Sequence, residues 1–92
     1  MSGTSLDGAD AALVDFASAA PRTLAFASVP FGRNLHDRIL RLCDPDTDSL
    51  DLAASVTLEL ATLYANAVEG AIAAGGVARE QIVAIGCHGQ TV

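Results

Sequence analysis

Positive charge is scarce in this chain of 92 residues. Five Lys and Arg residues stand against eleven Asp and Glu residues, so the formal net charge is −6 at pH 7. A protein that coats nucleic acid needs a basic face, and so does one that docks on an anionic membrane surface. The charge balance therefore argues against both classes of partner.

Cysteine and long hydrophobic runs are scarce as well. The two cysteines, Cys43 and Cys87, are too few for a disulfide scaffold and lack metal-ligand spacing, so we interpret them as reduced thiols. The longest apolar stretch, residues 50–75, is interrupted by acidic and amide side chains and is too polar for a membrane span. The opening residues show no secretory signal. Together these features predict a cytoplasmic protein.

Apolar residues are abundant. They make up 51% of the sequence against 17% charged residues, which excludes a disordered, low-complexity chain. The length allows at most one small domain. Because so short a chain buries only roughly 60–65% of its extended surface on folding, we expect little stability from these residues alone.

Two strands and two helices are predicted in succession. Loose alternation over residues 9–16 and apolar residues within 23–31 predict an antiparallel hairpin around a turn. Helical spacing predicts a short helix over residues 34–43. A longer helix follows a cap at Asp48 or Ser49 and stops at two glycines, Gly75 and Gly76.

A further strand and two structural assignments complete the prediction. Residues 82–85 form a short, continuous apolar run, typical of a strand that is buried on both faces of a sheet. Tyr64 lies beside the apolar stripe of the long helix and is assigned to packing. Three arginines with acidic neighbours on and just before the short helix, Arg33, Arg38 and Arg41, are typical of a solvated face.

The first candidate site is the opening loop. Its glycines permit positive φ and close approach of a ligand to the backbone, and successive N–H groups in such a turn form an anion-binding nest. Its hydroxyls add donors for phosphate oxygens, and its aspartates could hold Mg²⁺ beside them. The alternative is a plain hairpin turn at Asp7–Gly8. The candidate residues are Gly3, Thr4, Ser5, Leu6, Asp7, Gly8, Ala9 and Asp10.

The second candidate site follows the apolar run at residues 82–85. Ligands of parallel sheets bind beyond the carboxyl ends of the strands. A histidine and a glutamine here, flanked by glycines, could hydrogen-bond sugar hydroxyls or take part in proton transfer. The alternative is a strand-ending loop whose histidine bonds a backbone carbonyl. The candidate residues are His88, Gly89, Gln90 and Thr91.

Taken together, the two candidate sites resemble one family. Residues 1–10, Met-Ser-Gly-Thr-Ser-Leu-Asp-Gly-Ala-Asp, are similar to the Met-Ser-Gly-Thr-Ser-x-Asp-Gly-x-Asp signature of the anhydro-N-acetylmuramic acid kinases. Residues 85–91, Ile-Gly-Cys-His-Gly-Gln-Thr, resemble that family's second marker, Ile-Gly-x-His-Gly-Gln-Thr. The order of the two stretches and the helical segment between them also resemble the family.

The resemblance implies a fold and a reaction. The fold would be α/β, a partial first lobe of the ribonuclease H-like fold of sugar kinases, Hsc70 and actin, with a mixed sheet and helices. The enzyme would use ATP and Mg²⁺ to open the 1,6-anhydro ring of anhydro-N-acetylmuramic acid and to phosphorylate its 6-oxygen. The product, N-acetylmuramic acid 6-phosphate, belongs to cell-wall recycling. Residues 3–10 would bind the ATP phosphates, and residues 88–91 would lie near the sugar.

The resemblance also implies what these residues lack. Family members are several times longer, and their catalytic aspartate lies downstream of the second marker. We therefore expect residues 1–92 to be the N-terminal part of a first lobe, incomplete at both ends and inactive alone, with no catalytic residue and no assigned metal ligand. The implied partner is a small amino-sugar substrate. The resemblance leaves open whether the full-length protein forms a homodimer. Another sugar or acid kinase of the same fold, or a small non-catalytic binding module, remains an alternative.

Overall fold

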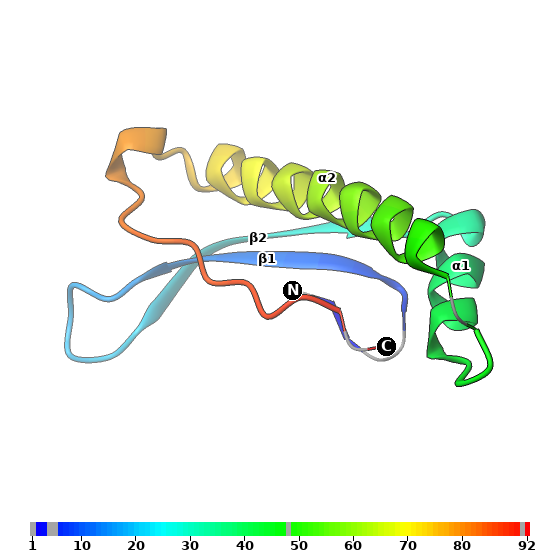
Figure 1. The fold of residues 1–92 in the computed structure, drawn as a ribbon. Helices are drawn as coiled ribbons and strands as arrows, with labels where there is room; N and C mark the ends of the chain where they lie inside the picture. Colours follow the sequence, from blue (N-terminus) through cyan, green and yellow to red (C-terminus); the bar gives the residue numbers. More distant parts are fainter. Residues whose placement is uncertain (1, 4–5, 48, 91) are drawn as a thin grey trace.

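The hairpin and the helices form as their sequence patterns predict. The computed structural model describes residues 2–3, 6–47, 49–90 and 92. Strands β1 (Gly8–Asp15) and β2 (Arg22–Pro30) pair in an antiparallel, two-stranded sheet (Figure 1). Each strand begins and ends one residue earlier than the alternation predicts. Half-buried Ala25 and Ala27 alternate with exposed Leu24 and Phe26 along β2, so one face of the sheet is covered.

Two helices follow the hairpin. Helix α1 spans Arg33–Cys43 and α2 spans Leu50–Gly75. The Ser49 side chain accepts a hydrogen bond from the backbone N–H of Leu52 at 3.0 Å, which confirms Ser49 as the cap; the alternative cap, Asp48, lies outside the described residues. Gly76 ends α2 in the left-handed conformation, with φ 66°. Within the described ranges, no helix is long and apolar enough to cross a membrane.

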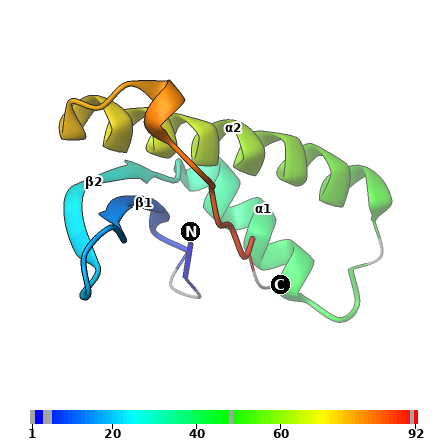
Figure 2. The same cartoon turned by 90° about the vertical axis from the view of Figure 1, so that its left-hand side faces the viewer.

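Helix α2 lies along one face of the sheet (Figures 1 and 2), and small residues allow its close approach. A Cβ atom built on Gly75 would come within 2.5 Å of the Leu13 side chain, and one on Gly70 within 3.2 Å of the Ala27 methyl group. Larger side chains at these two positions would push the helix away from the strands. The sheet and α2 therefore form two layers in close contact, with α1 packed at one end.

The apolar core lies at that end, and it includes the opening loop. Five buried side chains from the loop, α1 and α2 form one cluster: Leu6, Leu35, Ile39, Val56 and Leu60. Burial of a large aliphatic side chain contributes about 1.5–3 kcal/mol. This cluster therefore fixes the first residues of the chain against both helices.

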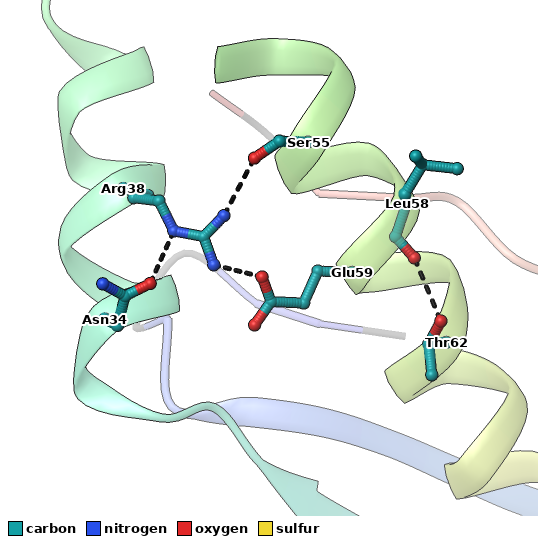
Figure 3. A network of polar contacts seen from close by, with 6 residues as sticks. All are labelled: Asn34, Arg38, Ser55, Leu58, Glu59 and Thr62. Atoms are coloured by element: carbon teal, nitrogen blue, oxygen red, sulfur yellow. Dashed lines mark hydrogen bonds and ion pairs between the residues drawn. The ribbon is translucent and has the colours of Figure 1, made fainter. Parts of the chain in front are cut away.

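A polar contact also joins the two helices, and it corrects the assignment of Arg38 to a solvated face. Its guanidinium donates to the Asn34 side chain at 2.7 Å, to the Ser55 hydroxyl at 3.0 Å and to the Glu59 carboxylate (Figure 3). The Arg38 side chain is only 20% exposed. Sequence spacing places Arg38 on the polar side of α1, but it cannot show that the polar sides of α1 and α2 meet.

The predicted buried strand at residues 82–85 is wrong. After a short 3-10 helix, η1 (Arg79–Gln81), residues 82–90 have no regular structure, and Val83 and Ile85 are 99% and 66% exposed. An apolar run becomes a strand only where a neighbour accepts its hydrogen bonds. A hollow of about 620 Å³ lies along this segment, β1 and α2. The described sheet is therefore an antiparallel pair, not the expected mixed sheet.

Candidate functional site

The opening loop turns back on itself just before β1. The backbone N–H of Leu6 donates to the carbonyl oxygen of Gly3 at 3.3 Å. Leu6 has a φ of 59°, a left-handed conformation that costs a non-glycine residue roughly 1–2 kcal/mol. Its side chain is 5% exposed within the core cluster, and that burial offsets the strain. The core therefore holds Leu6 in a conformation that its local sequence does not favour.

Gly8 is required where the loop enters the hairpin. A Cβ atom there would lie 2.6 Å from the carbonyl oxygen of Val29, a distance that real side chains do not adopt. One residue earlier, the Asp7 carbonyl accepts from the N–H of Phe31 at 3.0 Å and extends the pairing towards the loop. The glycine thus lets β2 approach closely and fixes the direction in which the loop leaves the sheet.

The predicted phosphate-binding residues divide into exposed and buried ones. Gly3, Asp7 and Asp10 are exposed, and the Asp10 carboxylate accepts a hydrogen bond from Ser28 across the hairpin. Leu6 and Ala9 are buried, so only their backbone atoms could face a ligand. The predictions for Thr4 and Ser5 fall outside the described residues.

The second candidate site lies beside the first. His88 is exposed, Gly89 has a φ of 80°, and Gln90 is half-buried; Thr91 lies outside the described residues. The side-chain amide of Gln90 donates to the carbonyl oxygen of Gly3 at 3.2 Å. Figures 1 and 2 both show the C-terminal segment running next to the opening loop. One hydrogen bond therefore joins the two candidate sites, which lie at opposite ends of the sequence.

Tyr64 takes part in this arrangement beyond the packing role that the sequence predicts. Its hydroxyl lies 2.6 Å from the Ser2 Oγ, and the two share a hydrogen bond. Ser2 is 4% exposed. A tyrosine beside an apolar stripe, in place of a phenylalanine, is the only signal of this contact in the sequence, because nothing local shows which residue its hydroxyl reaches.

The acidic groups suit a metal that arrives with its ligand. Among the residues with described positions, no group of three or more His, Cys, Asp or Glu side chains could hold a metal ion. Mg²⁺ in phosphoryl-transfer enzymes is bound by one or two carboxylates together with substrate phosphates. The exposed Asp7, next to the turn, could supply one such carboxylate.

Comparisons with known proteins point in one direction. A family model described as anhydro-N-acetylmuramic acid kinase matches residues 1–92. Proteins of that name from Shewanella sediminis and Saccharophagus degradans are each 42% identical to this chain, and one from Nitrosospira multiformis is 44% identical. Each match covers 100% of this chain and 25% of the relative. The chain thus spans about a quarter of the length of the curated relatives it matches.

Proposed function

Because this chain belongs to the anhydro-N-acetylmuramic acid kinase family, we propose that it forms the N-terminal part of the first lobe of such an enzyme. The lobe would have the fold shared by sugar kinases, Hsc70 and actin. The α/β arrangement is compatible with this assignment. The radius of gyration, 15.1 Å, supports it too, because a compact domain of this length would have about 12 Å. The chain is therefore more extended than a compact domain of the same length.

The proposed reaction couples ring opening to phosphoryl transfer. A water attacks the anomeric carbon of the 1,6-anhydro sugar, the bond from that carbon to O6 breaks, and O6 takes the γ-phosphoryl group of ATP. The products are ADP and N-acetylmuramic acid 6-phosphate, for cell-wall recycling in the cytoplasm. The base that removes the water's proton would be the family's downstream aspartate, so residues 1–92 alone would be inactive.

The single observation that carries the proposal is the bond from Gln90 to Gly3. Phosphoryl transfer depends on positioning and on neutralising charge, so the acceptor must lie next to the phosphate-binding turn. The bond joins Gly3, one of the proposed ATP-binding residues, to Gln90, one of the proposed sugar-binding residues. Exposed His88 is free to face a sugar hydroxyl, since it is not part of the core.

The opening loop would hold the ATP phosphates mainly through its backbone. Its N–H groups and hydroxyls would donate to phosphate oxygens, and buried Leu6 and Ala9 would fix that backbone from beneath. Asp7 would hold Mg²⁺ beside the phosphates. When bound, the metal would neutralise charge on the oxygens that transfer the phosphoryl group.

A phosphorylation assay with the full-length protein tests the proposal. Anhydro-N-acetylmuramic acid and radiolabelled ATP should give N-acetylmuramic acid 6-phosphate, and replacement of Gly3 or Gly8 by valine should abolish turnover. Gly32→Ser is the matched control, because Gly32 has extended backbone and nothing lies within 4 Å of a Cβ built there. Phosphorylation of a different sugar or acid in a panel, with none of the anhydro sugar, would overturn the substrate assignment. Undiminished turnover in both valine variants would overturn the loop's role.

A further inference from the structure

Tyr64 combines an apolar position with a polar contact. Its ring is half-buried on α2 and packs against the core cluster of Leu6, Leu35, Ile39, Val56 and Leu60. A phenylalanine would fill the same space. The hydroxyl adds a hydrogen bond that a ring alone cannot make, because it lies 2.6 Å from the Oγ of the buried Ser2. A buried hydroxyl without a partner is costly, so the pair is satisfied only while both members stay in place.

The contact lies at the upstream end of the opening loop. Ser2 immediately precedes Gly3, whose carbonyl accepts from Leu6 within the turn and from Gln90 across it. The downstream end is fixed separately, by the Leu6 side chain in the core and by Gly8 against Val29. Tyr64 therefore supplies a fixed point on a rigid helix for the end of the loop that lies outside the hairpin.

We propose that Tyr64 is a positioning residue, which holds the opening loop in its phosphate-binding conformation through the hydroxyl of Ser2. This inference rests on the proposed function of the loop. Tyr64 would touch neither ATP nor sugar. Its hydroxyl would restrict the loop before ATP binds, so that less conformational freedom is lost on binding. The loss of the hydroxyl should therefore weaken ATP binding more than it slows the bound complex.

The variant Tyr64→Phe in the full-length protein tests this directly, since it removes one oxygen and keeps the ring. We expect the KM for ATP to rise by about 3- to 10-fold, as the loss of one neutral hydrogen bond would give. The KM for the sugar and kcat should each change less than twofold, which is less than the loss of one hydrogen bond would cause. Thr62→Val is the matched control, because its hydroxyl donates to the Leu58 carbonyl within the exposed side of α2 (Figure 3).

The reciprocal variant separates positioning from general weakening. Ser2→Ala should raise the KM for ATP by the same factor as Tyr64→Phe, and the double variant should be no worse than either single one. Independent, multiplying effects would show that the two hydroxyls do not act together and would overturn the proposal. An equal change in the KM for both substrates, with a lower melting temperature, would show a merely structural role and would overturn it too.

A second measurement tests the positioning role of Tyr64 independently of the proposed function. Amide hydrogen exchange at Leu6, whose N–H closes the turn onto Gly3, reports the order of the loop without any substrate. Faster exchange in Tyr64→Phe, but not in Thr62→Val, would support the positioning role even if the full-length protein phosphorylates a different substrate. Unchanged exchange together with an unchanged KM for ATP would overturn the positioning role, whatever the protein phosphorylates.

Discussion

The side-chain amide of Gln90 donates a hydrogen bond to the carbonyl oxygen of Gly3, 87 positions earlier in the sequence. The same carbonyl also accepts from the N–H of Leu6, which closes the opening turn. One acceptor thus serves both the local turn and the long-range contact. A substitution at Gln90 should therefore alter the proposed phosphate-binding loop as well as the segment that contains Gln90.

Gln90→Ala in the full-length protein should raise the KM for both ATP and the sugar. The lost hydrogen bond releases both loops from each other, and a bond of this kind corresponds to about 3- to 10-fold in each constant. Steady-state kinetics with each substrate varied in turn would measure it. Gln81→Ala is the control: among the described contacts, the Gln81 side chain accepts only from the N–H of Ala78, the residue before η1. A change in the KM for one substrate alone would contradict the shared contact.

The local elements of the fold could be predicted from the sequence because their signals are local. The hairpin follows from two apolar stretches around a polar turn, and each strand lies within one residue of its predicted bounds. The cap at Ser49 and the stop at Gly76 each depend on the chemistry of one residue. The family resemblance, carried by residues 1–10 and 85–91, is confirmed over the whole chain.

The contacts between elements could not be predicted. The apolar run at residues 82–85 has a strand's composition but lies exposed, because a strand also needs a hydrogen-bonding neighbour. The sequence pattern predicts a solvated Arg38 and a packing role for Tyr64, yet each side chain joins two segments through a polar contact. Leu6 adopts a positive φ because the core buries its side chain, which no local pattern shows.

Gly8→Ala should destabilise the full-length protein. The added methyl group would meet the Val29 carbonyl at 2.6 Å, and backbone cannot move aside as a flexible side chain does. Strain from such overpacking is about 1–3 kcal/mol in the free energy of unfolding. Urea unfolding followed by circular dichroism measures the difference, with Gly32→Ser as the unstrained comparison. Equal stability of Gly8→Ala and the parent chain would show that β2 does not approach Gly8 this closely.

Ser49→Ala should destabilise α2 at its first turn. The Ser49 hydroxyl oxygen accepts from the N–H of Leu52, and alanine leaves that donor without its cap. The expected loss is about 1 kcal/mol, against only a few tenths for Ser49→Gly, because glycine lets water reach the same N–H group. Urea unfolding of the two variants side by side checks the ranking. If glycine proves worse than alanine, backbone flexibility rather than capping dominates at this position.

Arg38→Met should remove the polar contact between α1 and α2 without emptying the space between them, since methionine keeps much of the arginine stem. The variant removes the bonds to Asn34, Ser55 and Glu59. A hydrogen bond to a charged group contributes about 1.5–3 kcal/mol, and an ion pair at the surface contributes less. Because Arg38 makes contacts of both kinds, we expect a loss of about 1–2 kcal/mol in the free energy of unfolding.

The difference in the free energy of unfolding between Arg38→Met and the parent chain, measured again at high salt, identifies the source of that loss. Part of it is the attraction between Arg38 and Glu59, whose side chain is 44% exposed, so ions can screen it. At roughly 1 M NaCl the Debye length falls to about 3 Å, and the gap between Arg38→Met and the parent chain should narrow but not close. Arg41→Met is the control: Arg41 is exposed in the last turn of α1, where a cation contributes about 0.3–1 kcal/mol through the helix dipole. Equal losses for the two variants would mean that Arg38 acts only as another surface charge.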